Sequence, residues 1–361
     1  MSSSGKNRLT GLPRPRSAGA ASISVLIVDD SGLVRRALRS MLESDPSIRV
    51  VGEAANGREA IERATRLRPT IVTMDLEMPD MNGLEAIEQI MSVAPTRILV
   101  VTGLPRYAGL DATFESISRG ALELVPKPSA PSSGEELVRH VRALADVPVM
   151  PRFRVRAKER RARLRSGLVS VSPKVVVMGA STGGPSSLTR VFEHFAGPLR
   201  VPIVVVQHIS KEFAASFVDW LATRTALPVT EARPGVLHNG IHVGVRGAHV
   251  RVRSDGSAVR ADFSPEPPRG GHMPSIDVLF ESAADSFGAA AIGVLLTGMG
   301  NDGASGLLRI RTAEGMTIAQ DEHSSVVYGM PRVAVELGAV RLEAQPSEIG
   351  AELTRLVGAS A

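Results

Sequence analysis

Apolar and polar positions follow two different periods over the first part of the chain. Five short apolar runs predict β-strands, and the stretches between them carry apolar residues at helical spacing. The predicted strands cover residues 23–28, 49–52, 71–75, 97–101 and 121–125. Strands that alternate with helices are typical of a parallel sheet, and nearly continuous apolar strands indicate a sheet that is covered on both faces. We therefore predict a five-stranded parallel α/β domain over residues 23–146.

A second α/β pattern begins near Pro173. Its buried-type strands are predicted at residues 174–180, 202–207 and 289–295. The segments IHVG and HVRVR, within residues 241–252, are flanked by glycine-containing turns and predict an antiparallel excursion. The expected fold over residues 173–361 is a doubly wound, mostly parallel α/β domain.

Two segments outside these domains hold most of the positive charge. The 361 residues carry a formal net charge of +5. Residues 1–22 contain four basic side chains and no acid, and residues 151–167 contain eight basic side chains against Glu159 alone. The remainder is therefore net acidic, and with only 3% aromatic residues it argues against nucleic-acid binding. We predict a disordered basic tail over residues 1–22 and a basic linker over residues 147–172.

The composition also limits where the protein works. No apolar run approaches the ~20 residues of a membrane-spanning helix, and the polar N-terminus lacks the apolar core of a secretory signal. The chain contains no cysteine, which excludes disulfides, thiolate catalysis and cysteine-ligated zinc. We expect a cytoplasmic protein with no direct membrane insertion.

Five polar residues stand at strand ends of the first domain. Asp29 and Asp30 follow the first predicted strand, and Asp75 ends the third. Thr102 follows the fourth strand and Lys127 the fifth. The carboxyl ends of parallel strands meet in one crevice, where three carboxylates repel one another unless a cation is bound, and such a site suits Mg²⁺. One carboxylate can then accept a phosphoryl group, to which a neighbouring hydroxyl and ammonium can bond.

These segments resemble the receiver domains of bacterial two-component response regulators. The resemblance rests on VDDS, MDLEMPDMNGLE, VTG and PKP and covers the whole first domain. It implies a flavodoxin-like fold with Asp75 as the phosphoacceptor. It implies a magnesium site made of Asp29, Asp30 and Asp75, with Thr102 and Lys127 as the switch pair.

The loop GASTGG, residues 179–184, places Ser181 between a predicted strand and a predicted helix. It contains G-x-S-x-G, whose small flanking residues permit the sharp turn that lifts a serine hydroxyl above a sheet. Alone, the motif suits a glycine-rich anion-binding loop equally well, with the serine as a helix cap. His208 and Asp302 also follow predicted strands, so the three side chains can meet as nucleophile, general base and orienting acid.

Other patterns in the second domain carry less weight. Gly298, Gly300 and Gly303 spell the dinucleotide-binding pattern G-x-G-x-x-G, but Asp302 would put an anion where a pyrophosphate should lie. A lipase-like hydrolase would have the order serine, acid, histidine and would use a late histidine such as His323. We assign no role to the remaining histidines of the strand excursion and nearby loops, His238, His242, His249 and His272.

The second domain resembles the catalytic domain of chemotaxis protein-glutamate methylesterases over about residues 173–355. The matching segments are GASTGG, QHIS, PSIDVLF, LLTGMGNDGASG and AQDEHSSVVYGMP. The resemblance implies hydrolysis of glutamate γ-methyl esters on chemoreceptor helices, deamidation of receptor glutamines, and no cofactor in the hydrolytic step. Ser181, His208 and Asp302 match the catalytic triad of that family, whereas Met273 stands where many relatives carry arginine.

Further expectations concern the oxyanion site and the partners. Backbone amides near Thr182 and Met299 are candidates for binding the oxyanion. The resemblance implies chemoreceptor cytoplasmic helices as substrate and a chemotaxis-type histidine kinase as phosphodonor, and we expect a monomer. The alternative is a response regulator whose second domain binds a partner without catalysis.

Overall fold

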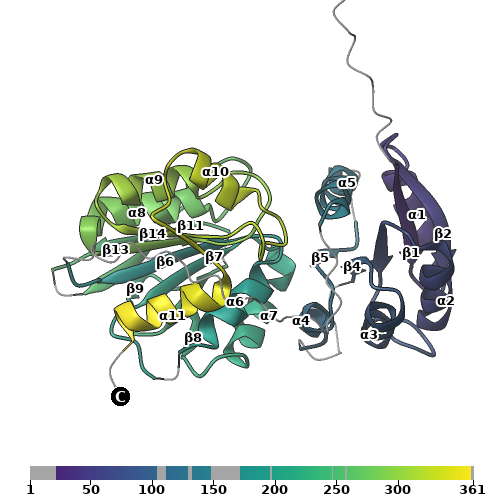
Figure 1. Cartoon of the computed structure of the whole chain (residues 1–361), viewed down its shortest axis with the longest axis horizontal. Helices are drawn as coiled ribbons and strands as arrows, with labels where there is room; N and C mark the ends of the chain where they lie inside the picture. The colour runs from purple at the N-terminus through teal and green to yellow at the C-terminus, as the bar shows by residue number, and fades with distance from the viewer. Residues whose placement is uncertain are drawn as a thin grey trace, which may run out of the picture.

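Two α/β units make up the described part of the protein (Figure 1). The computed structural model describes residues 22–103, 111–128, 132–147, 171–195, 197–245, 247–256 and 258–358. The predicted tail, apart from its last residue, and most of the predicted linker lie outside these ranges, so the proposed domain boundaries stay predictions. Among the described residues, no helix has the length and apolar character needed to cross a membrane.

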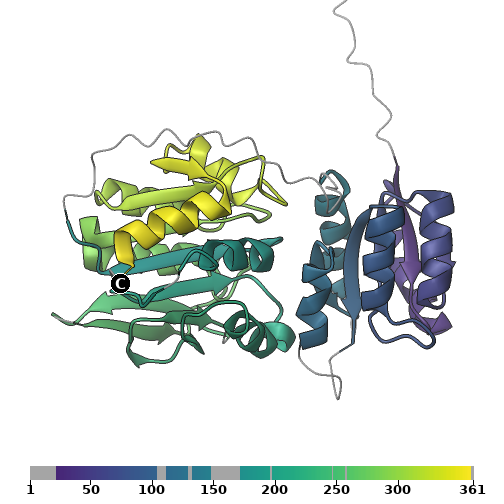
Figure 2. The same cartoon turned by 60° about the horizontal axis from the view of Figure 1, so that its bottom comes forward.

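The first unit contains a five-stranded parallel sheet in the order β2-β1-β3-β4-β5, as predicted. Its strands are β1 Ile23–Val28, β2 Ile48–Ala54, β3 Ile71–Met74, β4 Arg97–Thr102 and β5 Glu123–Pro126. Its helices are α1 Gly32–Leu42, α2 Gly57–Leu67, α3 Gly83–Val93, α4 Asp111–Ser118 and α5 Ser132–Ala145. Helices α1 and α5 pack together, and α3 packs against both α2 and α4, so that helices cover the two faces of the sheet (Figures 1 and 2).

Side-chain caps fix where the first three helices begin. The side chains of Ser31, Asn56 and Asn82 each accept a hydrogen bond from a backbone amide in the first turn of the following helix. Each cap also ends the loop that follows a strand of the sheet. The strand-end residues are therefore held between a buried strand and a capped helix.

The second unit is built on a seven-stranded, wholly parallel sheet in the order β15-β14-β13-β6-β7-β10-β8. Its strands are β6 Val175–Ala180, β7 Ile203–Gln207, β8 Val229–Glu231, β10 Ile241–Gly244, β13 Ala291–Leu295, β14 Met316–Gln320 and β15 Leu342–Ala344. Its helices are α6 Gly184–Phe192, α7 Lys211–Ala222, α8 Ile276–Phe287, the 3₁₀ turn η1 Gly288–Ala290, α9 Ala304–Thr312, α10 Met330–Glu336 and α11 Pro346–Val357. One face packs against α6, α7 and α11, and the other against α8, α9 and α10.

The predicted antiparallel excursion is only partly right. An antiparallel sheet does form, from β9 Gly235–Val236, β11 His249–Ser254 and β12 Val259–Ser264. The strand β10, however, lies in the main sheet, parallel to β7 and β8. Within β10, His242 is buried, with Nε2 bonded to the His238 carbonyl and Nδ1 to the Thr230 hydroxyl.

The two units contact each other through α4 and α7. Phe114 of α4 is fully buried and its ring lies 5.6 Å from that of Phe217 and 5.4 Å from that of Trp220, both on α7. Beside these rings, Arg224 lies 2.6 Å from Glu115 across the interface. Figures 1 and 2 show α4, β5 and α5 as the part of the first unit that faces the second. The contact therefore has an aromatic centre with an ion pair at its edge.

Candidate active site and phosphorylation site

Ser181 occupies the sharp turn between β6 and α6. Its amide donates to the Thr297 carbonyl (3.0 Å), and its own carbonyl accepts from the Gly184 amide (2.8 Å). Gly183 precedes α6 with φ of 77°, a left-handed conformation that side chains other than glycine adopt at a cost. Pro185 then lies in the first turn of the helix, where its fixed backbone angle suits a helix start. The backbone thus holds the serine at the end of the strand.

His208 lies beside Ser181 because β6 and β7 are neighbours in register. Ala180 pairs with Gln207, so each functional residue is the next one along its strand. The His208 Nε2 lies 2.9 Å from Asp302 Oδ2. With Nε2–H donating to the carboxylate, Nδ1 carries the lone pair; this nitrogen is buried and, within the described residues, has no hydrogen-bond partner. Nδ1 is therefore the atom available to accept a proton.

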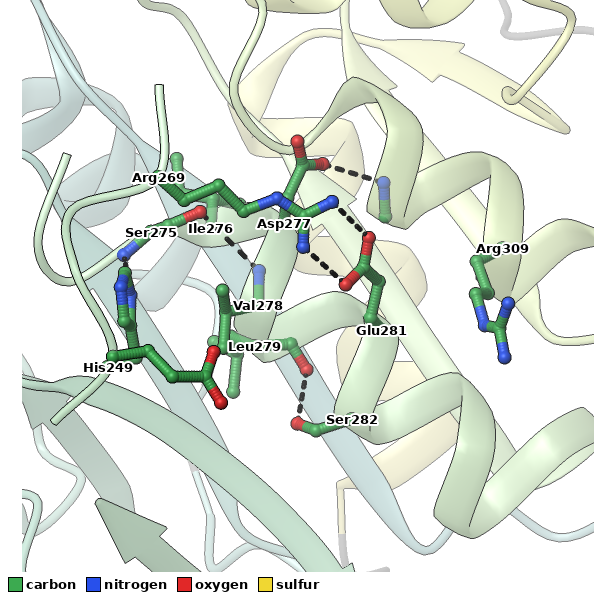
Figure 3. Close-up of polar contacts among 12 residues, drawn as sticks. His249, Arg269, Ser275, Ile276, Asp277, Val278, Leu279, Glu281, Ser282 and Arg309 are labelled. Atoms are coloured by element: carbon green, nitrogen blue, oxygen red, sulfur yellow. Dashed lines mark hydrogen bonds and ion pairs between the residues drawn. The ribbon is translucent and has the colours of Figure 1, made fainter. Parts of the chain in front are cut away.

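Asp302 is held by the first turn of α8. One carboxylate oxygen accepts from the Ser275 hydroxyl (2.8 Å) and the Asp277 amide (3.1 Å), and the other accepts from the Ile276 amide (2.8 Å) as well as His208. Figure 3 shows Ser275, Ile276 and Asp277 at the start of this helix. Burial raises the pKa of Asp302, but His208 and the backbone amides outweigh it and lower the pKa to about 2. The carboxylate is ionised at neutral pH.

Sequence reasoning found the three central residues and missed those that orient them. Ser275 comes from a segment quoted above only as a match, yet it both caps α8 and donates to Asp302. The Gln207 side-chain amide donates to the carbonyls of Ser181 and His208, both at 2.9 Å, and ties the two loops together. His272, to which no role was assigned, stacks on His208 with 3.9 Å between ring centroids. Gln207 and Ser275 lie in the matched segments QHIS and PSIDVLF, whereas His272 lies in none of the matched segments.

The other candidate residues of the second unit differ in how close they lie to Ser181. Thr182 and Met299 line the same cavity as Ser181, which leaves their amides as predicted oxyanion donors. Gly298 lies directly behind the serine, because a Cβ placed on it would be 2.6 Å from Ser181 Cβ. His323, needed by the lipase-like order, is exposed and is absent from the described lining of this cavity.

The cavity at Ser181 has a volume of about 480 Å³ and lies between the two units. Its walls include Ser181 and His208 from the second unit and Glu123, Arg139 and His140 from the first. Burial raises the pKa of the Glu123 carboxyl, even though the charge of His140 and a hydrogen bond from the Thr182 side chain oppose the rise. An acidic side chain of the first unit therefore stands beside the nucleophile loop.

The predicted phosphorylation site is assembled at the strand ends of the first unit. Carboxylate oxygens of Asp29, Asp30 and Asp75 lie within 4.8 Å of one another. The Lys127 ammonium lies 2.8 Å from Asp29 Oδ2 and 2.8 Å from Asp75 Oδ2. Burial raises the pKa of Asp75, opposed by Lys127 and by a hydrogen bond with the buried Thr102 hydroxyl. All five predicted residues thus converge.

The oxygen ligands in this acidic cluster fit a hard divalent cation. Three carboxylates supply ligand atoms at one crevice, and the exposed Asp30 leaves one side open for water or phosphoryl oxygens. The pKa of Lys127 is raised because its bonds to Asp29 and Asp75 outweigh the effect of burial. The ammonium is therefore charged and contributes to balancing the carboxylates.

A second cavity of about 350 Å³ connects this site to the neighbouring unit. It is lined by Thr102 and Lys127 on one side and by Ser210 and Glu212 on the other. Ser210 follows His208 by two residues and precedes α7. The switch pair, Thr102 and Lys127, and the loop that carries the general base His208 therefore border the same cavity.

Comparisons with known proteins agree with both halves of this architecture. The response regulator receiver domain model matches residues 25–141, and the CheB methylesterase model matches residues 176–353. A protein-glutamate methylesterase/protein-glutamine glutaminase from Geobacter metallireducens is 40% identical over 346 residues, which cover 92% of this chain and 99% of that protein. A protein of the same name from Paramagnetospirillum magneticum is 40% identical over 353 residues, covering 94% and 97%.

A solved structure supports the fold of the second unit. The crystal structure of the Thermotoga maritima CheB methylesterase catalytic domain aligns with a TM-score of 0.50 and 31% identity, covering 52% of this chain and all of that one. A receiver domain followed by a hydrolase-type domain defines a response regulator with an enzymatic output. Within that class, the chain belongs to the CheB methylesterase family.

Proposed function

We propose that this protein is a phosphorylation-activated protein-glutamate methylesterase that hydrolyses glutamate γ-methyl esters on chemoreceptors and also deamidates receptor glutamines. The observation that carries the proposal is the His208–Asp302 pair: His208 lines the same cavity as Ser181, and its Nδ1 has no hydrogen-bond partner among the described residues. The relatives named above carry both activities in their names. The resemblance described above implies cytoplasmic chemoreceptor helices as the substrate, so we place this protein in the cytoplasm.

The proposed reaction is an acyl transfer through Ser181. His208 Nδ1 takes the hydroxyl proton while Ser181 Oγ attacks the γ-carbonyl carbon of the substrate. The tetrahedral oxyanion collapses, the ester C–O bond breaks, and methanol leaves with the proton from His208; from a glutamine, ammonia leaves instead. Water then attacks the acyl-enzyme with the same base, which releases the glutamate carboxylate and restores the serine. Asp302 stabilises the transient imidazolium, and amides near Thr182 and Met299 would bind the oxyanion.

In the receiver unit, Asp75 would accept the phosphoryl group from a chemotaxis-type histidine kinase. Asp29, Asp30 and Asp75 would hold Mg²⁺, which supplies positive charge against the phosphoryl oxygens. Lys127 already lies 2.8 Å from Asp75 Oδ2, so it is in place to bond to a phosphate formed there. The Thr102 hydroxyl is near enough to Asp75 to oppose the rise in the pKa of its carboxyl, so it would be in place to bond to the phosphate.

The receiver unit would control access to the serine. Glu123, Arg139 and His140 line the cavity at Ser181, and they would keep a receptor helix bundle, a bulky substrate, from reaching the serine. Phosphorylation would favour a state in which the receiver unit no longer covers the cavity at Ser181. It can shift the equilibrium between the covered and open states only by the difference between its interaction free energies with them. A small ester should be admitted more easily than a receptor.

A covalent serine probe tests the proposal directly. A fluorophosphonate should label the full chain at Ser181, and Ser181→Ala should lose both labelling and release of methanol from methylated receptor. Ser305→Ala is the matched control, because Ser305 is also a serine near a helix start in this unit. Failure of the probe to label Ser181, with binding to receptor intact, would favour the non-catalytic module instead.

A further inference from the structure

The general base His208 has a second aromatic ring lying flat against it. The rings of His208 and His272 have their centroids 3.9 Å apart and an angle of 3° between their planes. Both residues line the cavity at Ser181. Parallel rings at this separation are in van der Waals contact over much of one face, so His272 covers that face of His208 and excludes water from it.

A tight turn places His272 in this position. Arg269 and His272 exchange two backbone hydrogen bonds, of 3.1 and 3.0 Å. Between them, Gly270 and Gly271 have φ of 59° and 85°, so both central residues are left-handed. This combination is typical of a type I′ turn, which favours glycine at its centre. A Cβ on either glycine would meet no atom within 4 Å, so the requirement for glycine is conformational.

The turn is anchored to the same helix that holds Asp302. The Arg269 guanidinium makes two hydrogen bonds to the Glu281 carboxylate, at 2.5 and 2.7 Å (Figure 3). Glu281 lies on α8, whose first turn supplies the Ile276 amide to Asp302. A two-pronged guanidinium–carboxylate pair fixes orientation as well as distance. One helix therefore sets the position of both groups that contact the His208 ring.

Stacking on His272 restrains the His208 ring in a way that the hydrogen bond to Asp302 does not. His208 has one hydrogen bond through its ring, at Nε2, and Nδ1 has no partner among the described residues. Nε2 lies nearer than Nδ1 to the axis of rotation about Cβ–Cγ, so a given swing of the ring plane displaces Nδ1 more than Nε2. That swing would change the direction in which Nδ1 points, and with it the path of a proton from Ser181. A flat neighbour on one face opposes it.

We propose that His272 is a positioning residue for the general base: by stacking on His208 it holds the ring plane in which Nδ1 faces Ser181. The proposal rests on the methylesterase function proposed above. It assigns no proton transfer to His272, so a flat ring of another kind should replace it. Orientation of this sort acts on the chemical step and leaves substrate binding largely unchanged.

The test compares two substitutions in the full chain. His272→Ala removes the ring, and we expect kcat for a small ester to fall about 10- to 100-fold with KM changed less than about threefold, since general-base help is worth ~10²–10⁴. His272→Phe keeps a flat ring, and we expect it to recover most of the lost kcat. His323→Ala, at an exposed histidine, is the control and should match the wild type.

A second variant keeps the proposal testable if His272→Ala does not fold. Gly271→Ala leaves His272 intact and strains the turn, so it should also lower kcat more than it raises KM. A kcat within twofold of wild type in His272→Ala, or equal loss in His272→Ala and His272→Phe, would overturn the stacking role. The rate of fluorophosphonate labelling separates the two proposals: absence of labelling at Ser181 in the wild type contradicts the hydrolase, whereas equal rates in wild type and His272→Ala contradict only the positioning.

Discussion

Replacing Asp302 by asparagine should disable the enzyme while leaving its substrate site intact. Four donors converge on the carboxylate: the Ser275 hydroxyl, two backbone amides and His208 Nε2. An asparagine offers one acceptor oxygen, and its NH₂ group must face at least one of these donors. The Ile276 amide can only donate a hydrogen bond, whereas Nε2 of the His208 imidazole can either donate or accept one. We therefore expect His208 to move its proton to Nδ1 so that Nε2 accepts from the asparagine.

The expected magnitudes follow from that change of tautomer. With a proton on Nδ1, His208 cannot take one from Ser181, and the same substitution in a serine protease triad lowers kcat about 10⁴-fold. The folded protein also loses stability. The pKa of Asp302 is about 2 instead of 3.8, and this difference corresponds to about 2.5 kcal/mol at neutral pH. Because the folded-state pKa is depressed, this contribution is present above pH 4 and is lost as pH falls towards 2.

Steady-state kinetics on a small ester and unfolding measurements check both parts. Asp302→Asn should lower kcat by at least about 10³-fold with little change in KM, and its stability deficit should shrink as pH falls from 4 to 2. Asp285→Asn is the control, since Asp285 is an exposed acid on α8 that pairs with Arg309. A loss of less than tenfold in kcat, or a stability deficit that does not vary with pH, would refute the reasoning.

Three further predictions follow from the same structure. Asp75→Asn should abolish labelling by a small phosphodonor in Mg²⁺, and acid-labile phosphate on this variant would rule out Asp75 as the acceptor. Phe114→Ala should raise basal methylesterase activity on receptor without phosphorylation, because it removes the buried ring between the units; unchanged basal activity would contradict control by occlusion. Burial raises the pKa of Asp277 to about 6, so its charge destabilises the fold as pH rises from about 4 to 6, and Asp277→Asn should gain up to about 3 kcal/mol relative to wild type over that range. Thermal unfolding at pH 4 and pH 7 measures this gain. If the stability difference between Asp277→Asn and the wild type is the same at both pH values, the prediction is wrong.

The sequence was most informative where function depends on strand ends. Asp75, Ser181 and His208 each follow a buried parallel strand. Residues that follow the strands of a parallel sheet all lie at its carboxyl edge, so their side chains come close together. Ser275 and His272 escaped notice because each acts through a contact made by a loop or helix start, at a distance in sequence that no periodic pattern encodes. Their positions depend on how α8 packs, which is a property of the folded unit.

The error at β10 has a related origin. The glycine-containing turns around residues 241–252 predict a change of strand direction, but they do not show which neighbour a strand pairs with, and they cannot distinguish an exposed histidine from one whose two nitrogens are both bonded inside the protein. His242 is of the second kind. Contacts between the units were equally hidden, because nothing around Phe114 in the sequence distinguishes a residue that packs within its own unit from one that packs across an interface.

The strand β5 has a consequence for how the protein can be altered. Its first residue, Glu123, borders the cavity at the serine, and Lys127, directly after its last residue, touches Asp75. Four residues of strand span only ~13 Å, without a joint between the ends. The site at Asp75 and the cavity at Ser181 are therefore bordered by the two ends of one short strand, with no loop between them. Inserting one residue would turn every side chain beyond it to the opposite face of the sheet, so β5 can vary in sequence but not in length.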